Sequence, residues 1–295
     1  MKISKKGLIY FALSGLLCGA GVILLFGHMS TRPTPSNVGR MAANEQEIAL
    51  TAEDGVRISA SYFPAQQTDA PVILLLHGNG ASRRQFTSHV AWLNRSGFSA
   101  MAIDFRGHGE SQLQPKSFGY FESRDAEAAV RWIKQQQPQA KIGVIGVSLG
   151  GAASLTGPNG PLPVDAMVLK AVYPDIDRAI RNRIAVHGGS ILSALLTPLL
   201  TNQAYFRFGV APDKVSPIKN ADRFDKPVLV IGGEKDSYTP VAESEALSNA
   251  FTGQSWLWIV GKLEHDQLSD LEDIVYQERI VRFFNESLKQ AGTRK

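Results

Sequence analysis

Two kinds of hydrophobic pattern follow one another along this chain. Residues 7–27 form an uncharged, predominantly apolar run directly after the basic start Met-Lys-Ile-Ser-Lys-Lys. In residues 56–63 apolar positions then alternate with polar or small ones, which predicts a half-buried strand in a hairpin with residues 46–51. Later runs are apolar at successive positions, as in parallel strands covered by helices on both faces. These runs are 72–76, 100–103, 142–145, 167–172, 228–231 and 256–260.

Helical patterns occupy several intervals between these runs. Apolar residues at positions 126, 129, 130 and 133 follow the spacing of one helix face, and a similar stripe runs from 274 to 288. Alternating strands and helices after an antiparallel start predict an α/β fold with a mostly parallel, doubly wound sheet. Ligands in such folds bind at the carboxyl ends of the strands, so the residues there are the candidates for chemistry.

The first apolar run is long enough to cross a membrane. Its twenty-one residues suit a helix through about 30 Å of hydrocarbon, whereas a secretory signal has an apolar core of about 7–15 residues. No small-residue cleavage site follows, and the bulky Leu17 before Cys18 argues against a lipoprotein signal. We therefore expect an uncleaved single-pass anchor over residues 1–29, with a cleaved signal sequence as the alternative.

The flanking residues predict how this anchor is oriented. Lys2, Lys5 and Lys6 favour a cytoplasmic N-terminus, which would put the rest of the chain on the non-cytoplasmic side, periplasmic or extracytoplasmic in a bacterium. Residues 30–43 contain Pro, Ser, Asn and Gly and are expected to form a tether. Residues 44–295 are expected to form the folded domain.

The net charge of +4 and the pI near 9.1 come from the N-terminal part. Residues 1–40 contain five basic residues and no acidic one, which leaves 26 basic and 27 acidic residues in 41–295. A nearly neutral body argues against a nucleic-acid partner. The sequence has no metal-binding spacing, Walker motif or dinucleotide fingerprint, so we expect neither a metal nor a cofactor.

The candidate nucleophile follows the run 142–147. Gly146-Val147-Ser148-Leu149-Gly150 is a G-x-S-x-G motif between an expected strand and an expected helix. The glycines permit a sharp turn that raises the Ser148 hydroxyl above the sheet edge, at a helix N-terminus whose dipole favours developing negative charge. The N–H of Leu149 would then face the substrate carbonyl oxygen as one donor of an oxyanion hole.

The second oxyanion donor is expected in the loop after residues 72–76. This loop reads His77-Gly78-Asn79-Gly80, and its glycines let the backbone approach a substrate. We expect the N–H of Asn79 to be the donor, with that of Gly80 as the alternative. His77 precedes the nucleophile at a strand end, so we expect it to order the loop by hydrogen bonding and not to act as the base.

A serine nucleophile needs a base, and the chain order Ser…Asp…His requires that base beyond the last strand. Of the six histidines, His265 alone has this position. Asp236 follows the run 228–231 and is the candidate acid that orients the imidazole and stabilises its charged form. The competing acids are Asp175, Asp177, Glu264 and Asp266.

These motifs, in this order, resemble the α/β-hydrolase superfamily, close to its serine esterases, thioesterases and S33/S9-type peptidases. The resemblance covers roughly residues 45–290 and includes residues 104–111, Asp-Phe-Arg-Gly-His-Gly-Glu-Ser, which are similar to a structural loop of the family. It implies a small helical cap between the sixth and seventh strands, at about residues 175–226. The apolar centre of this cap, residues 191–200, is either a buried helix or a lid wall that contacts an acyl chain or faces a bilayer.

The resemblance and the candidate residues together imply a serine hydrolase. It would cleave carboxylic esters or thioesters through an acyl-enzyme, with a small-molecule or lipid-like acyl substrate. Peptide or amide hydrolysis by the same residues is one alternative, and a non-catalytic binding protein of the same fold is another. The oligomeric state stays open.

Overall fold

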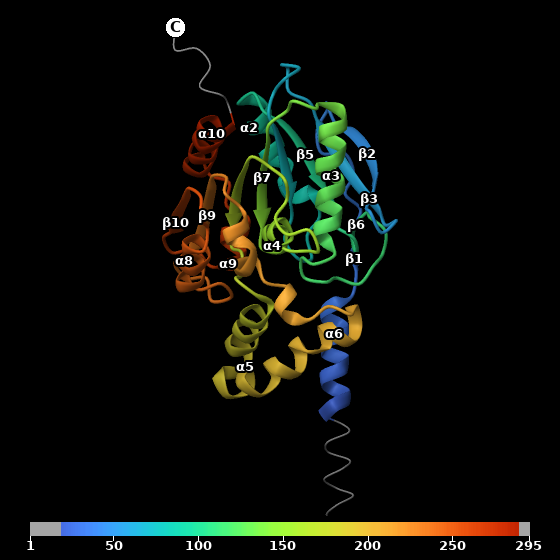
Figure 1. Ribbon diagram of the computed structural model, residues 1–295, viewed down its shortest axis with the longest axis vertical. Coiled ribbons are helices and arrows are strands. Elements are labelled where there is room, and N and C mark those ends of the chain that lie inside the picture. The colour runs from blue at the N-terminus through green and yellow to red at the C-terminus, as the bar shows by residue number, and fades with distance from the viewer. Residues whose placement is uncertain (1–18, 289–295) are drawn as a thin grey trace, which may run out of the picture.

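An eight-stranded sheet lies between two layers of helices in the computed structural model, which describes residues 19–288 (Figure 1). The strand order is β10–β9–β8–β7–β4–β5–β3–β2, and β3 alone runs antiparallel to its neighbours in this sheet. The predicted mostly parallel α/β sheet is therefore confirmed. Its strands are β2 (Gln46–Thr51), β3 (Arg57–Phe63), β4 (Val72–Leu76), β5 (Ser99–Ile103), β7 (Ile142–Val147), β8 (Ala166–Lys170), β9 (Val228–Gly233) and β10 (Ser255–Val260).

The helices bury the two faces of the sheet in separate apolar clusters. In β4, Val72, Leu74 and Leu76 face one cluster, while Ile73 and Leu75 face the other. The first cluster includes side chains of α3 (Glu122–Gln136), α4 (Leu149–Leu155) and α8 (Val241–Asn249), and the second those of α2 (Thr87–Arg95), α9 (His265–Ser269) and α10 (Ile274–Leu288). Such burial on both faces explains the continuous apolar runs in the sequence.

The last strand differs from this prediction. The run 256–260 was expected to be covered on both faces, but β10 is an edge strand with partly exposed residues, and Trp256 is 46% exposed. The prediction is wrong for this strand because coverage depends on its place in the sheet, and β10 has a neighbouring strand on one side only.

A helical cap lies between β8 and β9, the sixth and seventh strands of the main sheet. It contains α5 (Ile176–Thr201), α6 (Gln203–Phe208) and α7 (Pro217–Asn220), with short 3-10 turns at Pro212–Lys214 and Ala221–Arg223. Another 3-10 turn, Arg83–Phe86, lies outside the cap, between β4 and α2. Among the described residues, the span Ile176–Phe208 is one helical region long and apolar enough to cross a membrane. It is bent at Gly189, where φ is +79° and ψ is 171°, and it curls round one end of the molecule (Figure 1).

The N-terminal helix, described over Gly19–Thr31, packs beside this cap (Figure 1). The side-chain amide of Gln203 donates to the carbonyl oxygen of Ile23 at 3.0 Å, and the guanidinium of Arg207 donates to that of Leu24 at 2.7 Å. Residues 1–18 of the expected anchor lie outside the described residues.

The segment after this helix is attached to the body. β1 (Thr34–Pro35) pairs in parallel with β6 (His108–Gly109), and the side chain of Val38 is fully buried. The N–H of Val38 also donates to Glu110 at 3.0 Å. This arrangement differs from the free tether expected for residues 30–43, because backbone pairing and one buried valine hold the segment in place.

Candidate active site

The turn from β7 into α4 holds Ser148 in the conformation of a nucleophile elbow. Ser148 has φ +47° and ψ −106°, a strained combination for a residue with a side chain. The glycines of the motif allow the turn to pack closely: a Cβ at Gly150 would lie 2.1 Å from the carbonyl oxygen of Leu76, and one at Gly146 would lie 2.6 Å from the Cα of Gly151. The G-x-S-x-G spacing is thus required by the approach of α4 to β7 and β4.

His265 and Asp236 form a hydrogen-bonded pair. His265 begins α9 and Asp236 follows β9, and the imidazole Nδ1 lies 2.8 Å from Asp236 Oδ2. The other carboxylate oxygen accepts the N–H groups of Tyr238 and Thr239 at 2.9 and 2.7 Å, which fixes the carboxylate in its loop. A proton on Nδ1 directed at Asp236 leaves Nε2 as the acceptor, which is the tautomer that a general base requires.

The four competing acids have other partners or positions. Asp175 accepts the N–H of Arg178 and caps α5, whereas Asp177 pairs with Arg181 on the same helix. Glu264 caps α9 in a capping box, and Asp266 is exposed. Among the described residues, Asp236 is the acid that hydrogen-bonds His265.

Ser148, Leu149 and Asn79 line one small pocket. The three groups expected to hold the reacting carbonyl therefore come together at the carboxyl ends of β4 and β7. The hydroxyl of Ser148 makes no hydrogen bond to a described residue.

His77 is enclosed behind this pocket. Its Nδ1 lies 2.7 Å from the carbonyl oxygen of Gly78, and its Nε2 accepts the N–H of Phe105 at 3.1 Å. Complete burial lowers the pKa of His77 to about 3, so the ring is neutral over the physiological range. These contacts support its predicted role in ordering the loop.

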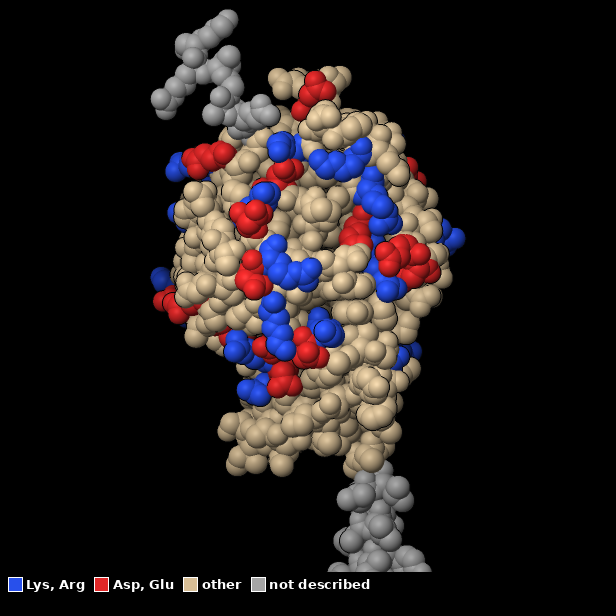
Figure 2. Space-filling view, in the orientation of Figure 1, with Lys and Arg blue, Asp and Glu red and all other residues tan. Residues whose placement is uncertain are grey.

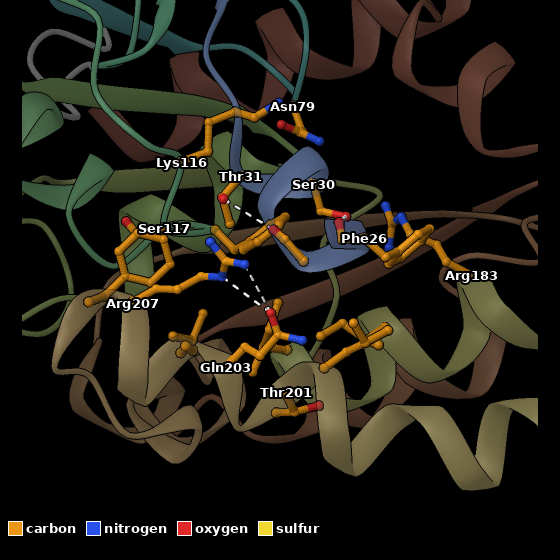
Figure 3. A pocket seen from close by; sticks show the side chains of 18 of the residues that line it. Phe26, Ser30, Thr31, Asn79, Lys116, Ser117, Arg183, Thr201, Gln203 and Arg207 are labelled. Carbon is orange, nitrogen blue, oxygen red and sulfur yellow. Dashed lines mark hydrogen bonds between the residues drawn. The ribbon is translucent and has the colours of Figure 1, made fainter. Parts of the chain in front are cut away.

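A larger cavity of about 640 Å³ adjoins the pocket of Ser148 (Figure 3). Its walls are the N-terminal helix, the cap and the loop around residues 116–120. Five residues line both spaces and connect them: Asn79, Phe118, Ile176, Ile180 and Arg183. The ring of Tyr238, which also lines the cavity, contacts the imidazole of His265 with 5.4 Å between ring centres.

Sequence reasoning missed several residues of these walls. Phe118 has a positive φ of 55°, and its carbonyl oxygen accepts the hydroxyl of Tyr173 at 2.8 Å. Lys116 lines the cavity, and burial lowers its pKa. Arg183 stacks on Tyr238 with 4.9 Å between its guanidinium carbon and the ring centre. None of these residues stands in a recognisable motif, because they come from two separate segments, the loop between β6 and α3 and the cap, that meet only in the folded chain.

Lys170 lies buried behind the nucleophile elbow. Its backbone carbonyl accepts the N–H of Ser148 at 2.8 Å, while its ammonium group donates to the carbonyl oxygen of Leu271 at 3.1 Å and lies 4.7 Å from the ring centre of Tyr276. Burial lowers the pKa of Lys170 to about 7. The side chain points away from the candidate site and bears on stability.

Comparison with solved structures identifies the fold. The chain is similar to the esterase Pf2001 of Pyrococcus furiosus, with a TM-score of 0.66 and 21% identity over 86% of this chain and 99% of that one. The chain has the fold of the α/β hydrolases. The chain is also similar to the α/β hydrolase GrgF from Penicillium, with a TM-score of 0.62 and 18% identity over 83% of this chain and 99% of that one.

Sequence comparison finds a matching family model and similar proteins. Residues 67–206 match the family described as serine aminopeptidase, S33. The chain is 26% identical to the uncharacterized protein Rv2307c of Mycobacterium tuberculosis over 282 residues, which are 92% of each chain. It is 30% identical to the putative esterase YheT of Escherichia coli over 130 residues, which are 42% of this chain and 38% of YheT.

Proposed function

We propose that this α/β hydrolase is a serine hydrolase that cleaves carboxylic ester or thioester bonds. The observation that carries the proposal is the hydrogen-bonded pair of His265 and Asp236, combined with a strained serine at the pocket that Asn79 and Leu149 also line. Such a set supplies a nucleophile, a base, an orienting acid and backbone donors for an oxyanion.

The chemistry takes place in two halves. Ser148 Oγ attacks the carbonyl carbon while His265 Nε2 takes the hydroxyl proton, and the N–H groups of Leu149 and Asn79 hold the oxyanion. The intermediate collapses to an acyl-serine, and the leaving alcohol or thiol takes the proton from His265. Water then attacks the acyl group with His265 again as base, which releases the carboxylic acid and restores Ser148.

The lining of the cavity favours an ester or thioester over a peptide with a free N-terminus. Among the described residues, the cavity wall includes no Asp or Glu, and its charged members are Lys116, Arg183 and Arg207. An aminopeptidase must accommodate the positive ammonium group of its substrate, which a cationic, mostly apolar wall disfavours. Hydrolysis of amides by the same residues, suggested by the S33 match, is the second candidate.

The test is labelling by a fluorophosphonate probe, which reacts with an activated serine. Wild-type protein and the matched variant Ser36→Ala, altered at an exposed serine, should label, whereas Ser148→Ala should not. An unlabelled wild type, or equal labelling of Ser148→Ala, would overturn the mechanism. Comparing kcat/KM for p-nitrophenyl acetate, a thioester and an aminoacyl p-nitroanilide then separates the two candidate reactions.

We also propose that residues 1–29 form an uncleaved anchor with the catalytic domain on the non-cytoplasmic side. The exposed apolar side chains of the described part that do not line the cavity support this, namely Val22, Leu24 and Leu25. The protein should stay with membranes in alkaline carbonate and be digested by protease added to the non-cytoplasmic side. A mature N-terminus after residue 28, or release by carbonate, would contradict the proposal.

A further inference from the structure

One end of the molecule has an apolar exterior. Ile191, Leu195 and Phe206 of the cap are 79%, 65% and 85% exposed, and Leu25 of the adjacent N-terminal helix is 60% exposed. Figure 2 shows no Lys, Arg, Asp or Glu on this lower end, whereas charges of both signs are spread over the rest of that face. An apolar patch of this kind on a protein surface marks an interaction site.

The sequence of both elements explains why this end carries no charge. Residues 188–206 of the cap contain no Lys, Arg, His, Asp or Glu, and neither do residues 19–27 of the helix. The chain before the described helix, residues 7–18, is also uncharged and mostly apolar, and it is preceded by three lysines. A bilayer is the partner that fits a charge-free tip continuous with such a segment, since hydrocarbon accepts apolar side chains and excludes ionised ones.

The inner faces of the same helices line the large cavity (Figure 3). Phe26, Gly27 and Met29 come from the N-terminal helix, and Leu200 and Phe208 come from the cap. The cavity therefore lies between the apolar tip and the pocket of Ser148. Its apolar wall includes part of the segment expected to anchor the protein.

Two hydrogen bonds close this wall. The side chains of Gln203 and Arg207 donate to the carbonyl oxygens of Ile23 and Leu24, and Gln203 Oε1 accepts from Arg207 at 3.1 Å. Gly27 lies against this contact, because a Cβ there would be 2.1 Å from Gln203 Oε1. The glycine thus permits the close approach of the helix to the cap.

We propose that the cap and the N-terminal helix together form a bilayer-embedded entrance, and that the substrate is an ester or thioester of a long hydrocarbon chain drawn from the membrane. The hydrocarbon chain occupies the cavity between the two elements, with the N-terminal helix as part of its binding wall, and the carbonyl group reaches Ser148. This inference rests on the proposed serine hydrolase and adds its substrate class and the route of entry.

The first test changes the cavity from the side of the helix. Gly27→Leu places a side chain at the helix–cap contact, and Gly21→Leu is its matched control, because a Cβ at Gly21 has nothing within 4 Å. In full-length protein reconstituted in phosphatidylcholine vesicles, we expect Gly27→Leu to lower the ratio of kcat/KM for p-nitrophenyl palmitate to that for the acetate by about tenfold or more, since apolar contacts along the chain are lost. Gly21→Leu should leave this ratio unchanged.

A second pair of variants guards against misfolding of the first. Leu200→Trp fills the cavity from the cap, whereas Leu199→Trp alters its exposed neighbour. The proposal predicts that Leu200→Trp lowers the ratio of kcat/KM for palmitate to that for acetate, and that Leu199→Trp does not. An unchanged ratio in both cavity variants, or equal changes in the control variants, would overturn it. Acetate turnover and fluorophosphonate labelling report the proposed serine chemistry separately, so failure of the two proposals is distinguishable.

The bilayer contact has its own test. In a Cys18→Ser background, Phe206→Cys and the control Val275→Cys on α10 can each carry an environment-sensitive fluorophore, since Cys18 is the one natural cysteine. In vesicles we expect a blue shift at position 206 with quenching by lipid-borne quenchers, and neither effect at 275. Identical behaviour at both positions would refute the bilayer contact. A shift without lipid quenching would put a second protein copy on this face and would also overturn it.

Discussion

Asp236→Asn tests how the proposed base is oriented. The carboxylate accepts two backbone N–H groups on Oδ1, at 2.9 and 2.7 Å, and faces His265 Nδ1 with Oδ2 at 2.8 Å. Asparagine keeps the size of the side chain, and its carbonyl oxygen is held by the same two N–H donors. The amide NH₂ then faces His265, so Nδ1 must accept and the ring proton moves to Nε2. This tautomer cannot take the proton of Ser148.

The size of the effect follows from these contacts. Restoring the productive tautomer requires the amide to flip, which leaves two buried N–H groups of the Asp236 loop without their acceptor. Each unsatisfied buried group costs about 1–3 kcal/mol, so the flip costs roughly 2–6 kcal/mol. At about 1.4 kcal/mol for each factor of ten, we expect kcat to fall by about one and a half to four orders of magnitude.

The assay is steady-state hydrolysis of p-nitrophenyl acetate, with thermal unfolding to verify that the variant is folded. Asp177→Asn is the matched control, because Asp177 is an exposed acid that pairs with Arg181 on the same helix. It should retain wild-type kcat. The reasoning would be refuted if folded Asp236→Asn kept more than about a tenth of kcat, or if Asp177→Asn lost as much activity.

Two further predictions concern stability. Burial lowers the pKa of Lys170 from 10.5 to about 7, so between these values the unfolded chain binds a proton that the folded protein does not, and stability rises with pH. Between pH 7 and pH 10, urea unfolding should show that the free energy of unfolding of the wild type rises by on the order of 3 kcal/mol more than that of Lys170→Met. Parallel plots of this free energy against pH for the two proteins would contradict the prediction. Gly150→Ala should cost about 3 kcal/mol or more, because its Cβ would meet the Leu76 carbonyl oxygen at 2.1 Å. Gly78→Ala, whose Cβ meets nothing closer than 3.7 Å, should cost less than about 1 kcal/mol, and equal losses would refute the steric argument.

Much of the fold was predictable because its signals are local. Apolar runs such as 72–76 directly reflect burial on both faces of a strand, and glycines on either side of Ser148 reflect a single tight turn. The pairing of His265 with Asp236 followed from chain order and from the rule that the carboxyl ends of parallel strands meet at one edge.

The parts that were not predicted depend on contacts between distant segments. The carbonyl oxygens of the N-terminal helix meet Gln203 and Arg207 across about 180 residues of sequence, and no spacing encodes such a contact. The exposure of Trp256 depends on which strand ends the sheet. The polar, Pro-containing composition of residues 30–43 suggested a free tether, while a single buried residue, Val38, helps to hold that segment on the body.

The pairing of β1 with β6 limits how freely the folded domain can move relative to the N-terminal helix, the proposed anchor. Two backbone bonds, from Thr34 to Gly107 and from Ser36 to Gly109, join the chain to the body within a few residues of the N-terminal helix. A domain on a long flexible linker would sample many orientations and heights above a membrane. This attachment instead holds the opening of the cavity in one orientation relative to the N-terminal helix. With the proposed anchor in a bilayer, the encounter with a substrate drawn from the membrane would be a two-dimensional search by lateral diffusion, and its rate would depend on the surface density of the lipid and not on its bulk concentration.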